Sequence, residues 1–300
     1  MANNRKLFSK TRTNLTGWLF MAPSMVFLLS FTIFPIFKTL VQSFFTISMN
    51  GKTKKFVGLE NYSTVFKDPV FAIVLKNTLK FAAIVIPLSL IIGLALALLL
   101  NKKFRGRGIA RVAIFYPNVA PVIGFATIWV FLLTPTIGLV DNVVRMLGLP
   151  SIDFLNNPKY ALFTIMGVYL WREASFIMIF YLSGLQNISQ EYYEAAHLDG
   201  ASRLTVLRKI TLPLIMPTTL FALTITMANA FKMVDLTMIM TTRGGPNNST
   251  NLLMHHIYLT AFTYWDQGQA AVLTIVMLGF MTLVACIQFG VIDRRTHYEN

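Results

Sequence analysis

Several polar or aromatic side chains stand inside otherwise apolar stretches, where they could contact a polar solute or one another. They are Trp171, Arg172, Glu173, Asn229, Lys232 and Asp235. A charge at bilayer depth costs about 2.5–3.5 kcal/mol on insertion scales, so such side chains usually face a cavity or a partner. Helical spacing would place Asn229, Lys232 and Asp235 on roughly one side of a helix. The set could hydrogen-bond a hydroxylated solute, or it could pair internally, for example Arg172 with Asp235.

Other chemistry has little support in the residue types. The single cysteine, Cys286, allows neither an intrachain disulfide nor a cysteine metal cluster. Of the four histidines only His255 and His256 are adjacent, and no carboxylate lies near that pair in sequence. We therefore expect no metal site. No arrangement of catalytic residues and no phosphate-binding G-x-x-x-x-G-K-[ST] loop occurs, so we expect neither enzymatic activity nor a cofactor on this chain.

The composition is that of a membrane protein. Of the 300 residues, 55% are hydrophobic and 13% are charged, whereas soluble domains carry about 25% charged residues. The net charge of +14 fits an excess of Lys and Arg in cytoplasmic loops. Since no nucleic-acid-binding pattern accompanies that charge, we expect no nucleic-acid partner.

Six apolar segments are long enough to span a bilayer, which takes about 20 residues each. The expected spans cover about residues 17–37, 81–100, 112–133, 160–185, 213–240 and 267–292. The third contains Pro117 and Pro121, and Pro135 follows it; we expect these prolines to break or end it. Three of the four tryptophans lie near predicted helix ends, and Trp171 does not. The predicted fold is all-α, with one transmembrane domain over residues 16–293 between tails 1–15 and 294–300.

The connection over residues 189–212 has the features of two short helices joined by a bend. Ser189 is a candidate N-cap, and Glu191 and Glu194 fall in the first turns, where the helix dipole favours carboxylates. Gly200 stands where a helix end favours a left-handed residue, and Pro213 can open the next span. Such a protrusion could convey movement from a soluble partner, or it could be an amphipathic helix lying on the inner leaflet.

A motif in this connection resembles the EAA signature of ATP-binding-cassette importer permeases, and it extends over about 20 residues. Its members are Glu194, Ala195, Ala196, Gly200, Ile210, Leu212 and Pro213, and Asp199 lies among them. The resemblance implies a type I importer permease fold. It also implies that the loop is a coupling helix, which docks in a cleft of a separate ATPase that binds ATP and magnesium.

Further residues resemble the carbohydrate branch of that family, which includes maltose-type and glycerol-3-phosphate-type importers. They are Trp171-Arg172, Leu182–Gln186, Phe231–Asp235, Thr242, Gly244-Gly245-Pro246, Asn248-Ser249-Thr250, Tyr258 and Ala261-Phe262. The likeness covers most of the chain from the first span onward. The loop between the second and third spans is short, and the large periplasmic insertion of the maltose subunit is not present. The resemblance therefore points to the compact members of the branch.

The resemblance implies import of a mono-, di- or oligosaccharide by alternating access. It also implies a second homologous permease subunit, two ATPase subunits and an extracytoplasmic solute-binding protein. The expected location is the cytoplasmic membrane of a prokaryote, with both termini cytoplasmic, because the inner loops carry more Lys and Arg. Import of glycerol-3-phosphate or another polar solute, and an ion-driven secondary transporter, are the alternatives.

Overall fold

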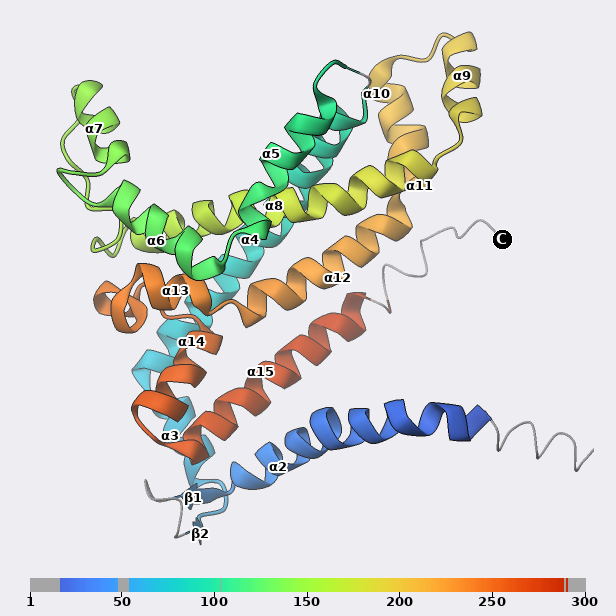
Figure 1. Ribbon diagram of the computed structural model, residues 1–300. Coiled ribbons are helices and arrows are strands. Elements are labelled where there is room, and N and C mark those ends of the chain that lie inside the picture. The colour runs from blue at the N-terminus through green and yellow to red at the C-terminus, as the bar shows by residue number, and fades with distance from the viewer. Residues whose placement is uncertain (1–16, 48–53, 103, 289, 291–300) are drawn as a thin grey trace, which may run out of the picture.

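The computed structural model describes residues 17–47, 54–102, 104–288 and 290, and it is mostly helical (Figure 1). Within the described residues, five helical segments are long and apolar enough to cross a bilayer. They are Gly17–Gln42, Pro69–Asn101 (α4), Ala161–Asn187 (α8), Met216–Met240 and Gln267–Ile287 (α15). A bent pair, α5 (Arg107–Val119) and α6 (Val122–Leu133), makes a sixth if it counts as one span.

Shorter elements join these segments. The first span includes η1 (Leu29–Ile33) and α2 (Phe34–Gln42), and β1 (Phe45–Ile47), β2 (Lys54–Phe56) and α3 (Glu60–Lys67) follow it. Farther along are α7 (Leu139–Met146), α9 (Gln190–Leu198), α10 (Arg203–Val206), η2 (Leu207–Thr211) and α11 (Leu212–Leu214). The fifth span consists of α12 (Met216–Lys232) and α13 (Asp235–Met240), and then come η3 (Thr242–Gly244), η4 (Pro246–Asn248), α14 (Leu253–Tyr258) and η5 (Leu259–Thr263).

The contact between α4 and α8 forms the centre of the helical packing. Gly93 of α4 lies so close to α8 that an added Cβ would be 2.9 Å from Ile177 Cγ2 and 3.1 Å from the Ala174 carbonyl oxygen. Farther along the same pair, the rings of Phe81 and Tyr169 meet edge to face at 5.2 Å. α5, α12, α13 and α14 pack against this pair, and the crossing fixes the position of the polar side chains that α8 carries.

The observed spans differ from the expected ones mainly at their ends. The second helix begins at Pro69 rather than residue 81, because the Asp68 side chain caps it by accepting a hydrogen bond from the Val70 N–H at 2.8 Å. Its first turns carry Lys76 and Asn77, which an apolar criterion omits. The expected tails 1–15 and 294–300 lie outside the described residues.

The third and fifth spans are both interrupted. α5 and α6 meet at 97° around Ala120 and Pro121, because proline lacks a backbone donor and disfavours a helical residue before it. The break expected at Pro121 is therefore confirmed, whereas Pro117 does not break the helix but lies inside α5. The fifth span was expected to be continuous, and this is wrong: Met233 and Val234 separate α12 from α13. Lys232 and Asp235 are therefore not neighbours on one helical side, but flank a break.

A two-stranded hairpin departs from the expected all-α fold. β1 and β2 pair antiparallel, with Phe45 opposite Phe56. The Asn61 side-chain amide donates to the carbonyl oxygens of Ser43 and Phe45, at 2.9 and 3.1 Å. A Cβ on Gly268, in the first turn of α15, would lie 2.5 Å from the Phe45 carbonyl oxygen. The hairpin therefore fixes the start of the last span against the first.

The loop after α13 folds back on itself through two glycines. A Cβ on Gly244 would lie 2.7 Å from Asn251 Cβ, and one on Gly245 would lie 2.4 Å from Thr250 Oγ1. Both glycines have positive φ, at 88° and 75°, which other residues rarely adopt. The Asn77 side chain of α4 donates to the Asn248 carbonyl at 2.8 Å. The glycine pair thus permits a compact loop attached to α4.

Two histidines are buried after this loop, in α14, outside the segments that could cross a bilayer. Burial, with a smaller effect of neighbouring His256, lowers the pKa of His255 to about 4. Burial also lowers the pKa of His256, although the Asp68 carboxylate partly opposes this effect. Both side chains are therefore held neutral in the folded chain at neutral pH.

The contact at Gly93 predicts the effect of a methyl group. Gly93→Ala should lower the free energy of unfolding by about 1–3 kcal/mol, because the new Cβ overpacks the helix crossing. Gly167→Ala is the matched control on α8, since a Cβ there meets nothing within 4 Å. It should be neutral or stabilising by up to about 1 kcal/mol. Thermal unfolding of the detergent-purified variants measures both, and equal melting temperatures would contradict the close approach.

The buried histidine predicts a loss of stability in acid. Unfolded histidine takes up its proton below a pH of about 6.5, whereas His255 stays neutral in the folded chain down to about 4. Between those values the unfolded state binds more protons, so stability falls as the pH falls. His255→Gln should reduce the fall in melting temperature between pH 7.5 and 5, and His197→Gln, at an exposed position of α9, should not. Parallel curves for wild type and His255→Gln would refute this expectation.

Candidate functional site

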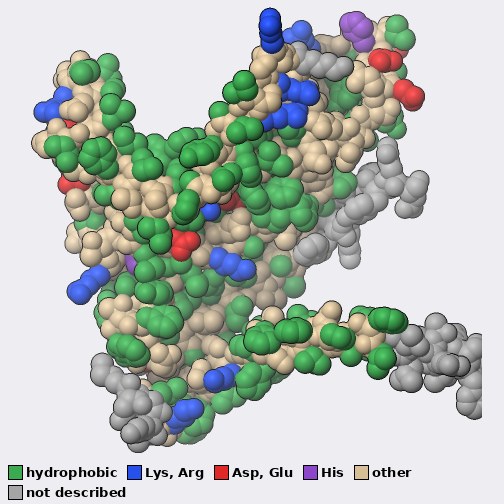
Figure 2. All heavy atoms as spheres, viewed as in Figure 1, with side chains coloured by type: hydrophobic (Ala, Val, Ile, Leu, Met, Phe, Trp, Pro, Cys, Tyr) green, Lys and Arg blue, Asp and Glu red, His purple; other side chains and the backbone are tan. Residues whose placement is uncertain are grey.

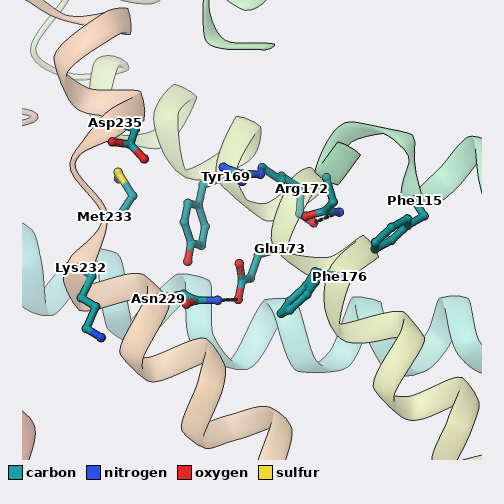
Figure 3. Close-up of a pocket in the computed structure, with 10 residues that line it drawn as sticks. Phe115, Tyr169, Arg172, Glu173, Phe176, Asn229, Lys232, Met233 and Asp235 are labelled. Carbon is teal, nitrogen blue, oxygen red and sulfur yellow. Dashed lines mark hydrogen bonds between the residues drawn. The ribbon is translucent and has the colours of Figure 1, made fainter. Parts of the chain in front are cut away.

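A polar cavity of about 380 Å³ lies where α5, α8 and the α12–α13 break meet (Figure 3). Its lining contains most of the residues that the sequence singles out for a solute path, together with others that the sequence does not. The lining residues are Phe115, Asn118, Tyr169, Arg172, Glu173, Phe176, Asn229, Lys232, Met233 and Asp235. The cavity is mixed in character, with charges of both signs, amides and aromatic rings.

Glu173 is the most enclosed charged group of the cavity, at 6% exposure. The Asn229 side-chain amide, from α12, donates to Glu173 Oε1 at 3.1 Å. The Tyr169 hydroxyl points toward the same pair (Figure 3), and it is buried without a hydrogen-bond partner in the described structure. An unpartnered buried hydroxyl is costly, so this side of the cavity can accept a further polar group.

Arg172 lines the same cavity and is half-buried. The Asn118 side chain of α5 donates to the Arg172 carbonyl at 3.0 Å and to Ser175 Oγ at 2.7 Å, which ties α5 to α8 beside the guanidinium. The structural alternative of an Arg172–Asp235 ion pair is not observed. Among the described residues, the one salt bridge within 4.0 Å joins Arg145 to Asp141.

Trp171 is a correction to the expected set. Its side chain is half exposed and does not line the cavity; it packs against Phe125 and Trp129 of α6, at ring distances of 5.7 and 5.5 Å. The reason is geometric, since residues two apart on a helix point about 200° apart. Glu173 faces the cavity, so Trp171 must face away from it.

Sequence reasoning missed five of the lining residues: Phe115, Asn118, Tyr169, Phe176 and Met233. A usable signal existed for Asn118, since it is an amide just before the proline break of an apolar segment. Tyr169 lies one turn before Glu173 on α8, so helical spacing could have found it. The aromatic and methionine side chains carry no such signal, because they are ordinary in membrane helices.

Both interrupted spans end at this cavity. α12 stops at Lys232 and α13 starts at Asp235, so the cation lies at a helix C-terminus and the carboxylate at a helix N-terminus, as the helix dipoles favour. Phe115 and Asn118 of α5 also line the cavity, just before the bend to α6. Irregular backbone at membrane depth is tolerated where it lines a cavity or is buried in protein.

The connection over residues 189–212 forms the expected two helices and bend. Ser189 Oγ caps α9 by accepting a hydrogen bond from the Glu191 N–H at 3.3 Å. Gly200 adopts a φ of 68°, and the Ala201 N–H donates to the Ala196 carbonyl at 3.0 Å, which closes the helix end. Ser202 caps α10. Figure 1 shows α9 standing clear of the spanning helices, near the ends of α10 and α11.

The residues of this connection divide into an inner and an outer set. Ala196 is buried at 7% exposure, and Ala195, Ala196, Asp199 and Ile210 line a groove of about 330 Å³ between α9 and the α10–η2 segment. Glu194, Gly200, Leu212 and Pro213 are exposed. Leu198 is 88% exposed at the end of α9. Small alanines therefore let the two helices approach, while the end of α9 presents an uncovered apolar side chain.

The surface around this protrusion is rich in basic side chains, with acidic ones on α9 (Figure 2). The described residues contain no group of three or more histidine, cysteine, aspartate or glutamate side chains that could hold a metal ion. Neither the cavity nor the protrusion arranges a nucleophile beside a base. The geometry is that of a polar cavity among the apolar helices and a projecting pair of short helices.

Comparisons with known proteins agree with this geometry. The sulfoquinovosyl glycerol transport system permease protein SmoG of Agrobacterium fabrum is 32% identical over 93% of this chain and 90% of its own. The trehalose/maltose transport system permease protein MalF of Thermococcus litoralis is 31% identical over 97% of both. A solved bacterial transporter that imports the polysaccharide alginate superposes with a TM-score of 0.84 at 22% identity, covering 97% of this chain and 100% of that one.

The fold of the alginate transporter chain is therefore shared by this protein. A family model described as the inner membrane component of binding-protein-dependent transport systems matches residues 86–298, which include the cavity and the whole 189–212 connection. The chain therefore belongs to the family of inner membrane permease components of binding-protein-dependent transport systems.

Proposed function

We propose that this chain is the membrane-spanning subunit of an ATP-binding-cassette importer for a carbohydrate. The observation that carries the proposal is the polar cavity at the two helix breaks, within spans that are otherwise apolar. Membership of this family argues against the alternative that the chain is an ion-driven secondary transporter. The two relatives described above are named for glycoside transport, which favours a mono-, di- or oligosaccharide over glycerol-3-phosphate.

The cavity has the groups that a sugar needs. Sugar hydroxyls donate and accept, so they suit a wall that mixes amides, a carboxylate and a hydroxyl. Asn118, Glu173 and Asn229 supply such groups, and the unpartnered Tyr169 hydroxyl offers one more. Phe115 and Phe176 add apolar faces against which the C–H side of a sugar ring can pack. Arg172, Lys232 and Asp235 complete the proposed path.

The cavity also argues for a second permease subunit. Lys232 and Asp235 are exposed on this chain alone, although they lie in a segment that is otherwise apolar enough to cross the bilayer. Contact of both charges with lipid would cost several kcal/mol. A homologous subunit that covers the opening would replace lipid with polar groups and close the path, which then lies between two permeases.

Coupling to ATP is assigned to the 189–212 connection. The cleft of a separate ATPase would hold α9, with Leu198 inserted and Glu194 and Asp199 at its edge. Two ATPase subunits, which bind ATP and magnesium, would drive alternating access, and an extracytoplasmic solute-binding protein would deliver the sugar. This arrangement places both termini in the cytoplasm of a prokaryote, with the chain in its cytoplasmic membrane.

A substitution in the cavity separates transport from assembly. Asn229→Leu removes the donor to Glu173 and should lower sugar uptake at least tenfold, because a buried carboxylate loses its partner and the path loses an amide. Lys80→Gln is the matched control: it changes a polar residue of α4 whose ammonium lies over the Phe163 ring, outside the cavity. Uptake of a panel of radiolabelled sugars into cells measures the effect. Full uptake by Asn229→Leu, with the chain at normal levels, would exclude the cavity as the path.

A substitution at the end of α9 tests coupling. Leu198→Asp should abolish ATP-driven uptake without unfolding the chain, since the side chain is 88% exposed, and Glu194→Ala should weaken uptake. Leu147→Asp, at a 71% exposed position after α7, is the control and should transport normally. Copurification of the ATPase with each variant gives the second measurement. Uptake that survives Leu198→Asp at full rate would refute the coupling assignment while leaving the cavity proposal intact.

A further inference from the structure

Basic side chains gather where α4 ends and the chain turns into α5. Lys102 and Arg105 are exposed, and Arg107 and Arg111 are half-buried. The turn is short, and Gly106, with a φ of 88°, is the residue before α5. Because α4 is one of the apolar spans, these cations lie at the bilayer surface.

Two of these cations have a structural role. Arg111 Nη2 donates to the Leu100 carbonyl at 3.3 Å, and Arg107 Nη1 makes a long contact of 3.5 Å with the Asn101 carbonyl. These carbonyls belong to the last turn of α4, where they lack helical partners and carry the negative end of the helix dipole. The guanidiniums therefore hold the turn in place. Arg111 Nε remains buried with no hydrogen-bond partner in the described structure.

Lys102 and Arg105 have no such task. Among the described residues, the one salt bridge within 4.0 Å joins Arg145 to Asp141. No described carboxylate therefore lies within salt-bridge distance of Lys102 or Arg105. Next to them, Phe104 is 47% exposed, Ile109 78% and Val112 69%. Ile109 and Val112 are three residues apart and so lie on one side of α5. A rim of positive charge thus borders an uncovered apolar face.

We propose that the Lys102, Arg105, Arg107 and Arg111 turn binds the phosphate headgroup of an anionic phospholipid. Clusters of Lys and Arg directly after a membrane helix suit such headgroups, and the acyl chains would lie along Ile109 and Val112. The first turn of α5 has no side-chain cap, so the N–H groups of Gly108 and Ile109 can also face phosphate, whereas that of Arg107 already donates to the Phe104 carbonyl. If these cations served only to orient the chain in the membrane, their charges would be enough. The unpartnered Arg111 Nε and the adjoining apolar face would then have no role. The inference does not depend on which solute is transported.

The test uses the purified importer, with this chain in complex with its partner subunits. Native mass spectrometry, during titration with phosphatidylglycerol and separately with phosphatidylcholine, gives the affinity for the first lipid bound. Each surface cation contributes about fivefold to anionic-lipid affinity, so Lys102→Gln with Arg105→Gln should weaken the first phosphatidylglycerol about 25-fold. Phosphatidylcholine binding should not change. The matched control is Lys67→Gln with Lys159→Gln, two exposed lysines elsewhere, and it should bind as wild type does.

Other outcomes would overturn the proposal. Equal phosphatidylglycerol affinity in wild type and the double variant would show that the turn holds no headgroup. An equal loss of phosphatidylglycerol affinity in the control variant would show that the effect comes from the net charge of the chain and not from this turn. Displacement of the lipid by millimolar inorganic phosphate would assign the site to a free anion, and loss of the ATPase from the double variant would assign it to a protein contact. If the double variant does not assemble, Arg105→Gln alone should weaken binding about fivefold, and unchanged binding would refute the proposal.

Discussion

The cost of removing charge from water governs the placement of the charged side chains of α8, α12 and α13. In α4, by contrast, Lys76 and Lys80 lie near the helix start and outside the cavity. Glu173, Asn229, Lys232 and Asp235 collect at one cavity, and the two helices that change direction do so at its border. A broken helix leaves backbone groups unpaired, and a cavity that already needs polar contacts is the place where they cost least. The two helix breaks and the polar cluster therefore lie together for the same reason, which is the cost of leaving polar groups unpaired in the bilayer.

Apolar length and turn chemistry were enough to predict the general plan from the sequence. The segments expected at 160–185 and 267–292 have the composition of spans, and their described parts form α8 (Ala161–Asn187) and α15 (Gln267–Ile287). The α5–α6 bend follows from Pro121. Ser189 and Gly200 act locally, and the cap and bend around α9 appear where they were expected. Such features depend on neighbours within a few residues, which a sequence displays directly.

Features set by distant parts of the chain were not predictable in this way. Nothing in the sequence near Met233 marks a helix break, because neither proline nor glycine lies there. The break is instead stabilised by the packing of α13 on other helices. The direction of Trp171 depends on which side of α8 meets α5, and the β1–β2 hairpin depends on Asn61 and Gly268, which come from separate segments. Within the cavity, the charged members could be identified from sequence, whereas Phe115 and Phe176 resemble ordinary lipid-facing residues until the fold places them.

The exposure of Lys232 and Asp235 on the isolated chain has a consequence for the energetics of assembly. A copy inserted without the proposed covering subunit would present two charges to hydrocarbon, at a cost of several kcal/mol. In the proposed assembly that cost disappears when the second subunit binds. The same charges that line the path would therefore add to the free energy of subunit association, so that solute recognition and assembly would depend on one pair of side chains.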